Sequence, residues 1–338
     1  MKRLLPLAIL VCLPSVLQAK PTLEIALDSS QLKNPFGVAF DEQSNAYVAE
    51  FMGGRILKLT VDGKLTTISG NGEKGFAGDG EDAKKAIFHG MHNIVRTRSG
   101  NLYISDSFNN LIRKIDGKTN FVSTVAGIPG KKGFSGDGGP ATKALLSNPI
   151  SISLTSDEST LLIADIRNRR IRGIDLKTGT IKTLAGNGEK GKPKAGQKAT
   201  EQPLLDPRAS AMDVKGNLYV LERNGNALRI VRRDGLIFTL AGTGKKGTQD
   251  GPAKQATFSG PKHLCIDPQG KVVIADDNNH LIRLYDPKTK TVSTILGGDA
   301  EPKTKLNRPH GVTIAPDGSL WVSDSWNNRV VILRNYQQ

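Results

Sequence analysis

The sequence has little cysteine, few aromatic residues and no long helical pattern of apolar residues. Two cysteines occur in 338 residues, and aromatic residues make up 5% of the chain. Cys12 lies in the N-terminal apolar run, so a chain that loses this run keeps only Cys265 and forms no intramolecular disulfide. We expect Cys265 to be a small buried hydrophobe. The 37 glycines, together with the missing helical pattern, predict many short strands and turns.

Residues 1–19 have the organisation of a signal peptide. Two basic residues precede an apolar run over 4–17, and Ala19 stands at a cleavage position. A membrane-spanning helix needs about 20 apolar residues, and this run is shorter and is broken by prolines. We therefore expect a cleaved signal, a secreted or periplasmic protein without a transmembrane helix, and a single mature domain over 20–338.

The chain is basic, with 47 lysines and arginines against 32 aspartates and glutamates, which gives a formal charge of +15. Removal of Lys2 and Arg3 with the signal lowers this charge to +13. In an exported protein, such a charge favours an anionic ligand, peptide or glycan, or a protein partner. The lysines are dispersed and are not interleaved with aromatic residues, so we expect no nucleic-acid binding.

Six segments of similar sequence recur along the chain. Each contains an apolar run that ends at an acidic residue, here called the anchor, and a polar loop follows it. Two of these segments read SDSFNN at 105–110 and SDSWNN at 323–328. The anchors are 56, 59, 57, 54 and 48 residues apart, a spacing that predicts an array or a propeller. They are Glu50, Asp106, Asp165, Glu222, Asp276 and Asp324.

Each unit has the pattern of four short strands. An apolar strand is followed by a glycine turn, by the strand that ends at the anchor, and by strands such as RILKLT and TTISG. This pattern predicts an all-β, six-bladed β-propeller with four-stranded blades. The fourth strand occurs five times for six units. We expect TLEIAL, at 22–27, to supply the missing strand and to close the ring, which removes an exposed sheet edge.

The periodicity of the anchors predicts a structural role for them. We expect their carboxylates to accept backbone N–H groups in the following loop and to pair with an arginine in the same blade. In four blades an arginine stands seven residues after the anchor, namely Arg113, Arg172, Arg229 and Arg283.

Glycine-rich loops of a second repeating type join the units. Those at 70–88 and 127–146 contain Ala-x-x-Ala, which predicts a short helical turn. The aspartates of these loops are candidate calcium ligands, but the acidic series of a calcium-binding loop is absent, so we favour turn-forming roles. They are Asp79, Asp137 and Asp250.

The repeat resembles the NHL-repeat family of propellers, in a secreted, bacterial-type form. The resemblance covers 22–338 and is clearest in RPHGVTIAPDGSLWVSDSWNNRVVIL and SGNLYISDSFNNLIRKI. It implies that the loops before the first strands and the loops after the anchors share one face, which is then the natural site. Because one propeller fold serves many functions, the resemblance leaves the function open.

The entrance of each first strand to that face lies fourteen residues before the anchor, or fifteen in blade three. These positions, here called the entrance ring, are Phe36, His92, Ile150, Arg208, Lys262 and His310. Blade four breaks the Asp-rich pattern with Glu222 and Arg223, and a site that breaks a repeat is informative. His263 follows Lys262 and is off register by one, so its side chain is expected on the other face of the strand. We predict a ligand site lined by Arg208, Glu222, Arg223, Lys262 and His263.

His92 and His310 are candidate metal ligands, because imidazoles at a channel mouth can hold zinc and leave a position for water. The resemblance supports this hypothesis, because peptidyl-amidoglycolate lyases are NHL-like propellers that bind zinc through histidines of different blades. Gluconolactonase-like propellers instead bind a divalent metal through Glu, Asn and Asp. That makes Asn34 and Asn148 further candidates, although Asn-Pro is also explained by a turn.

Two function classes therefore stay open. One is an exported, monomeric binding module whose loop-rich face holds the ligand. The other is a metal-dependent lyase or hydrolase with zinc or calcium. We favour the binding module, because no complete catalytic constellation can be assembled from the sequence.

Overall fold

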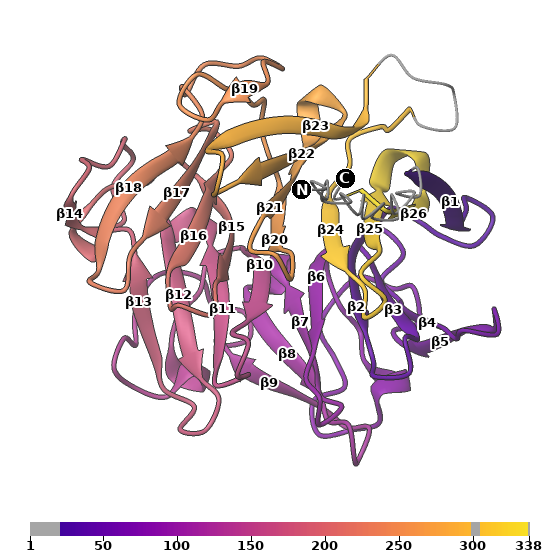
Figure 1. Ribbon diagram of the computed structural model, residues 1–338. Coiled ribbons are helices and arrows are strands. Elements are labelled where there is room, and N and C mark those ends of the chain that lie inside the picture. Colours follow the sequence, from indigo (N-terminus) through magenta and orange to yellow (C-terminus); the bar gives the residue numbers. More distant parts are fainter. Residues whose placement is uncertain (1–20, 299–304, 337–338) are drawn as a thin grey trace, which may run out of the picture.

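Six antiparallel sheets form the blades of a ring in the computed structural model, which describes residues 21–298 and 305–336 (Figure 1). The innermost strand of each blade contacts the innermost strands of both neighbours, including the first blade and the last. The prediction of an all-β, six-bladed propeller is confirmed. The expected signal peptide lies outside the described residues. Within the described ranges, no helix is long and apolar enough to cross a membrane.

The strands of each blade follow one another from the channel outward. Blade one contains β2 (Pro35–Phe40), β3 (Ala46–Glu50), β4 (Ile56–Leu59) and β5 (Leu65–Ser69). Blade two contains β6 (Met91–Arg96), β7 (Leu102–Asp106), β8 (Leu111–Ile115) and β9 (Val122–Ala126). Blade three contains β10 (Pro149–Leu154), β11 (Thr160–Asp165), β12 (Arg170–Asp175) and β13 (Ile181–Ala185).

Blades four and five carry a short fifth strand at the outer edge. Blade four contains β15 (Pro207–Met212), β16 (Leu218–Glu222), β17 (Ala227–Val231), β18 (Leu236–Ala241) and β14 (Gln197–Lys198). Blade five contains β20 (His263–Ile266), β21 (Val272–Asp276), β22 (Leu281–Asp286), β23 (Thr291–Gly297) and β19 (Gly251–Pro252). Blade six contains β24 (Gly311–Ile314), β25 (Leu320–Asp324), β26 (Arg329–Arg334) and β1 (Thr22–Leu27).

The ring is closed by its first strand, as the sequence predicts. β1 pairs antiparallel with β26, from Thr22 opposite Arg334 to Leu27 opposite Val330. Leu27 is 1% exposed and belongs to an apolar cluster with Val38 and Val48 of blade one. The N-terminal strand therefore joins the last blade to the first by both hydrogen bonds and packing.

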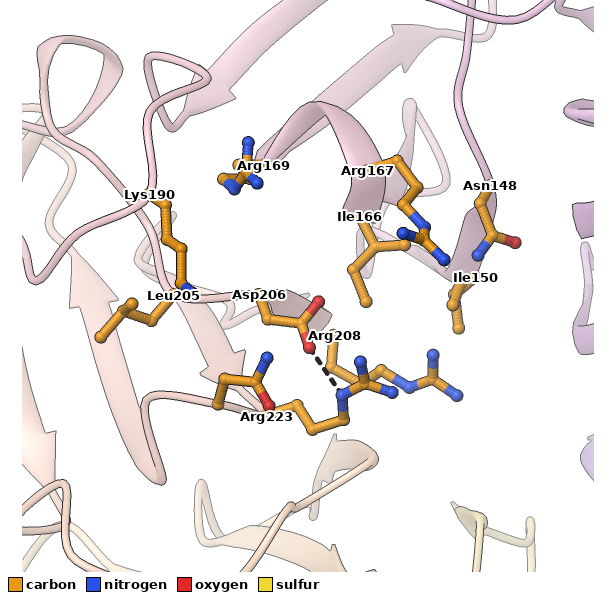
Figure 2. Close-up of a pocket in the computed structure, with 11 residues that line it drawn as sticks. Asn148, Ile150, Ile166, Arg167, Arg169, Lys190, Leu205, Asp206, Arg208 and Arg223 are labelled. Atoms are coloured by element: carbon orange, nitrogen blue, oxygen red, sulfur yellow. Dashed lines mark hydrogen bonds and ion pairs between the residues drawn. The ribbon is translucent and has the colours of Figure 1, made fainter.

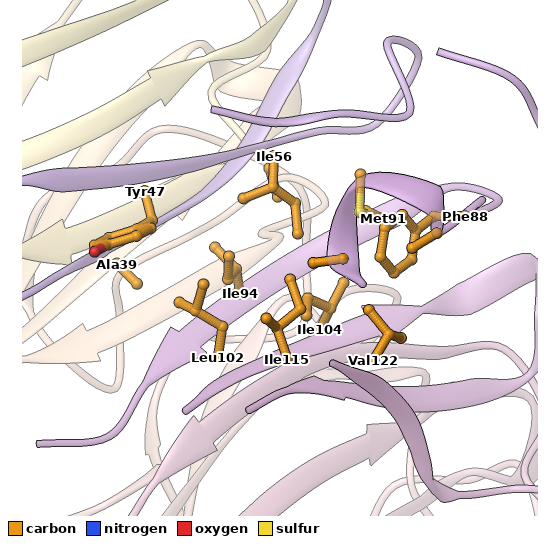
Figure 3. Close-up of a cluster of buried hydrophobic side chains, with 13 residues drawn as sticks. Ala39, Tyr47, Ile56, Phe88, Met91, Ile94, Leu102, Ile104, Ile115 and Val122 are labelled. Carbon is orange, nitrogen blue, oxygen red and sulfur yellow. The ribbon is translucent and has the colours of Figure 1, made fainter. Parts of the chain in front are cut away.

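The apolar core lies between neighbouring blades. Figure 3 shows the cluster between blades one and two, where Ile56 of β4 faces Ile94 and Ile104. Burial of one such side chain contributes about 1.5–3 kcal/mol. The Ala-x-x-Ala turn of the glycine-rich loop completes this cluster, because Ala83 and Ala86 are buried in it. The helical turns predicted in the loops at 70–88 and 127–146 are the 3-10 helices η1 (Ala83–Lys85) and η3 (Ala141–Lys143), and the loop before blade four contains a third, η5 (Ala199–Glu201).

The anchors have the structural role that their period predicts. All six accept a backbone N–H from the residue seventeen positions earlier, or eighteen in blade three, as Asp106 does from His89 at 2.7 Å. The expected donor loop was wrong, because this N–H precedes the first strand instead of following the anchor. Every anchor also pairs with an arginine of its own blade at 2.6–3.4 Å. The predicted Asp–Arg pair is confirmed.

The aspartates of the glycine-rich loops contact the same arginines from the outer side. Asp79 pairs with Arg113 at 2.7 Å, and Asp137 and Asp250 pair with the equivalent arginines of blades three and five at 2.6 Å. These ion pairs explain the three aspartates as structural residues without a bound calcium ion.

The loops after four of the anchors begin with 3-10 helices, η2 (Ser107–Asn109), η4 (Ile166–Asn168), η6 (Asp277–Asn279) and η7 (Ser325–Asn327). In SDSFNN, the Ser107 hydroxyl donates to the Pro149 carbonyl of the next blade at 2.5 Å, and the Asn110 side chain accepts from the Asn148 N–H at 2.8 Å. SDSWNN makes the same two contacts with blade one. The repeated hexapeptide therefore links each of these blades to its neighbour.

Candidate functional site

The entrance ring meets at one mouth of the central channel, as predicted. The Phe36 ring is stacked on His310 with 3.8 Å between ring centroids, and His92 lies 5.3 Å from Phe36 and 5.7 Å from His310. Arg208 reaches the same place from blade four, since its Nη2 lies 2.8 Å from Nε2 of His310. Residues that are more than 200 positions apart in the sequence therefore share one small space.

Arg208 is a buried cation that faces a neutral partner. Its side chain is 4% exposed, and its Nε has no hydrogen-bond partner. Among the described residues, no carboxylate lies within ion-pair distance of this guanidinium. Burial, together with the charge of Arg223, lowers the pKa of Arg208 to about 9. Asp206 and Asp277 attract this charge only from beyond ion-pair distance. A buried charge without a paired carboxylate costs folding free energy, so this residue requires an explanation beyond stability.

Lys262 adds a second cation beside Arg208. Its Nζ lies 3.7 Å from the Asp277 carboxylate, which the Arg308 guanidinium also approaches at 3.3 Å. Burial and the charge of Arg208 lower the pKa of Lys262 to about 8. One buried carboxylate is thus shared by two cations, and a net positive charge remains on this side of the mouth.

Two cavities of about 260 Å³ open at this cationic side and share Arg223 and Asn224 in their linings. Figure 2 shows the first cavity, where Arg167, Arg208 and Arg223 approach the same space and Asp206 pairs with Arg223. Asp206 is the only acidic residue in the two linings among the residues that the structure describes. The cations that line them are Arg167, Arg169, Lys190, Arg208, Arg223, Lys246, Lys262 and Arg308.

The opposite side of the mouth is aromatic. Phe51 is stacked on Phe36 at 4.4 Å, and its ring meets the edge of Phe108 at 5.5 Å. His92 is held by the Gly90 carbonyl and the Ser107 hydroxyl through Nδ1. Burial and the positive charge of Arg208 place the pKa values of His92 and His310 well below the usual range, so both imidazoles are neutral.

The histidine pair does not fit a zinc ion as it stands. In the part of the chain that the structure describes, no group of three His, Cys, Asp or Glu side chains is close enough to hold a metal. The Nε2 atom of His310 is hydrogen-bonded to the Arg208 guanidinium, and this positive charge would repel a metal ion. The zinc site stays a prediction with two imidazoles and no third ligand.

The two asparagines proposed as ligands of a lactonase-like metal site are also explained by the structure of the backbone. Asn34 donates its side-chain amide to the Ser325 carbonyl, and both Asn34 and Asn148 have positive φ angles of 56° and 54°. These are the left-handed conformations that asparagine favours in turns. The turn interpretation of the Asn-Pro pairs therefore holds, although Asn148 also lines the first cavity.

Two of the five residues predicted to bind the ligand lie outside both cavities. Glu222 is fully buried, and its carboxylate is bonded to Arg229 and to the Leu205 N–H. Glutamate in place of aspartate therefore gives this anchor a longer side chain, and its carboxylate does not line either cavity. The ring of His263 lies between Asn93 and the backbone of Val312, and burial lowers its pKa to about 4. Arg208, Arg223 and Lys262 do line the cavities.

Several cations of the site were missed by the sequence reasoning. Arg167 stands two residues after its anchor, a position that the alignment of the units could have singled out. Lys190 and Lys246 come from the glycine-rich loops, whose path does not follow from strand register. Arg308 occupies a turn with a φ of 49°, two residues before His310.

The chain is similar to known proteins over most of its length. The family model of the NHL repeat matches residues 306–333. NHL repeat-containing protein 2 of Gallus gallus is 27% identical over 91% of this chain and 47% of that protein. Protein SUPPRESSOR OF QUENCHING 1, chloroplastic, of Arabidopsis thaliana is 27% identical over 80% of this chain and 26% of that protein. The chain thus spans about half the length of these relatives or less.

Solved structures share the architecture. An auxiliary nutrient binding protein from Bacteroides thetaiotaomicron matches with a TM-score of 0.65 and 13% identity, over 90% of this chain and 69% of that one. A catalytically inactive virginiamycin B lyase from Staphylococcus aureus, solved with quinupristin, matches with a TM-score of 0.59 and 14% identity, over 93% and 99%. At such identities the likeness shows the fold alone. The chain is a six-bladed β-propeller that carries NHL repeat sequence.

Proposed function

We propose that this propeller is a binding module that takes an anionic ligand at the channel mouth, with Arg208 as the central contact. The observation that carries the proposal is the burial of the Arg208 guanidinium without a carboxylate in ion-pair distance. A ligand carboxylate or phosphate would supply the missing counter-charge, because its oxygens match the guanidinium fork. The buried charge is then a cost that the free protein bears and that binding offsets.

The surrounding charge supports the same conclusion. Eight cations line the two cavities, with Asp206 in the lining and Asp277 behind Lys262. A concave site lined by one sign of charge attracts ions of the opposite sign and speeds their association. A fold likeness to a nutrient binding protein from Bacteroides thetaiotaomicron is compatible with this proposal.

Export is part of the proposal. The organisation of residues 1–19 predicts a secreted or periplasmic protein. We further propose that it acts as a monomer, as a bacterial-type NHL propeller. N-terminal sequencing of the mature protein tests this point, and a chain that begins at Lys20 is the expected result. A mature chain that retains Met1 would contradict it.

The metal-dependent lyase or hydrolase is not put forward as a second function. Its two imidazoles, His92 and His310, lack a third His, Cys, Asp or Glu ligand among the described residues, and Arg208 is bonded to one of them.

The test is a calorimetric titration of the full chain with pyrophosphate and with citrate, one probe for each acid class. We expect Arg208→Met to weaken binding about tenfold or more, since a hydrogen bond to a charged group contributes about 1.5–3 kcal/mol. Arg223→Gln should weaken it as well. The control is Arg233→Gln, which removes an exposed arginine in the turn between β17 and β18, at the other end of blade four. If all three variants bind like the wild type, the site is not at the mouth.

A further inference from the structure

One residue of SDSFNN makes no hydrogen bond through its side chain. Ser105, Asp106 and Ser107 hydrogen-bond through their side chains, and the two asparagines do so as well. The Phe108 side chain is 48% exposed at the mouth. The equivalent residue of SDSWNN, Trp326, is 59% exposed. Because the fold leaves about half of each ring exposed, that surface is available for a ligand.

The residue two positions after each anchor is exposed in all six blades, and together these residues form a rim around the mouth. They are Met52, Phe108, Arg167, Asn224, Asn278 and Trp326. The rim is apolar on blades six, one and two and polar on blades three, four and five. Exposed apolar residues that are scattered singly are ordinary, whereas a group of them marks a binding surface. The apolar rim residues stand on three successive blades, and this grouping points to binding.

The entrance ring beneath the rim is divided in the same way. His310, Phe36 and His92 lie under the apolar rim residues and form the stacked aromatic group. Arg208 and Lys262 lie under the polar ones. Blade three is the junction, where Ile150 lines the first cavity together with Arg167.

The two sides adjoin each other at blade three. A third cavity is lined by Phe108, Asn148 and Arg167, and the first cavity shares the latter two residues. The Phe108 ring has a defined place, because a Cβ built on Gly90 would lie 2.6 Å from its Cδ2 atom. At the other end of the cationic side, the Arg308 guanidinium lies 5.7 Å from the ring centroid of Trp326.

We propose that the ligand is an aromatic anion, a small molecule in which a flat ring carries a carboxylate or a phosphate. This inference rests on the proposed function and deepens it. The ring would pack on Phe108 and the edge of Phe51, while the acid group reaches Arg167 and Arg208 through the shared cavity. Aromatic pairs gain free energy beyond burial through their edge-to-face geometry, which an alkyl group does not offer. A uniformly charged polyanion would leave the aromatic half of the mouth without a partner.

The experiment compares ligands of equal charge on the full chain. Phenyl phosphate is titrated against methyl phosphate with ³¹P NMR detection, and benzoate against acetate with ¹H detection, so that the two acid classes are separated. We expect the aryl member of the preferred class to bind about threefold to tenfold more tightly than the alkyl member. Phe108→Ala should remove this preference and leave the affinity for the alkyl anion unchanged. Arg208→Met should weaken both members.

The matched control is Phe121→Ala, which removes a phenylalanine that is 50% exposed in the turn between β8 and β9, at the opposite end of blade two. This variant should keep the aryl preference. Equal binding of aryl and alkyl anions by the wild type, or retention of the preference in Phe108→Ala, would overturn the inference and leave the proposed function standing. If none of the four anions binds while pyrophosphate or citrate does, only the inference fails; if none of these six anions binds, both fail. Phe108 is exposed, so a melting curve that matches the wild type is expected for its variant.

Discussion

Arg208→Met and Arg229→Met are expected to change stability in opposite directions, although both replace a buried arginine of blade four. Arg229 is 2% exposed and pairs at 2.6 Å with Glu222, which is fully buried. Its removal leaves a buried carboxylate without a counter-charge, which costs about 3–5 kcal/mol. Arg208 has no carboxylate to abandon, so methionine removes a buried charge and keeps most of the volume.

The gain for Arg208→Met can be bounded from the structure. Burial lowers the pKa of Arg208 from 12.5 to about 9, and each pH unit corresponds to about 1.36 kcal/mol, so the upper bound is about 5 kcal/mol. Replacing buried charges with apolar groups has gained about 1–4 kcal/mol in other proteins. We therefore expect Arg208→Met to be more stable than the wild type by about 1–4 kcal/mol.

Urea denaturation followed by tryptophan fluorescence and by circular dichroism measures both variants under the same conditions. The wild type is measured without and with saturating anion, because a ligand that binds the folded state adds stability that Arg208→Met should lose. Destabilisation of Arg208→Met as large as that of Arg229→Met would refute the reasoning. Arg208 would then be a structural residue, and the case for an anionic ligand would lose its main support.

Three further predictions follow from other parts of the molecule. Anion affinity should fall as the pH rises above about 8, because Lys262 carries its charge below its pKa of about 8 and loses it above. Lys262→Arg should flatten the part of a calorimetric pH profile that lies below the pKa of Arg208, which is about 9. An equally steep profile in that variant would contradict the assignment. Elemental analysis of the purified chain should find no stoichiometric zinc, because Arg208 is bonded to His310; one zinc per chain that is lost in His92→Ala would restore the metal hypothesis. Leu27→Ala should lower the free energy of unfolding by about 2–5 kcal/mol. Ile25→Ala, in the same strand but 51% exposed, should leave it nearly unchanged. Equal urea midpoints for the two variants would show that packing of β1 does not close the ring.

The architecture could be predicted because each blade repeats the same local solution. The anchor spacing predicts six blades, and the count of fourth strands identifies 22–27 as the closing strand from the sequence alone. The entrance ring was also predictable, since strand register fixes which residue reaches the mouth once the anchor is aligned. Phe36, His92 and His310 meet there because of register alone.

The site was less predictable, because it depends on distances across the ring that no repeat encodes. Glu222 looked exceptional in the sequence, yet it serves as an anchor with a longer side chain. Arg208 looked like one more basic residue, and its lack of a carboxylate partner became visible only in three dimensions. Lys190 and Lys246 reach the cavities from loops whose conformation follows from local hydrogen bonds.

The pairing of β1 with β26 also constrains how the protein can fold. Thr22 meets Arg334 across almost the entire chain, so blade six can be finished only after the last strand has been synthesised. Until then, β1 has no strand to pair with, and Leu27 lacks its contact with Val330 of β26. Such long-range pairing slows folding and leaves a sheet edge open to other chains in the meantime. The strand β1 must therefore remain accessible for pairing with β26 while the first five blades fold.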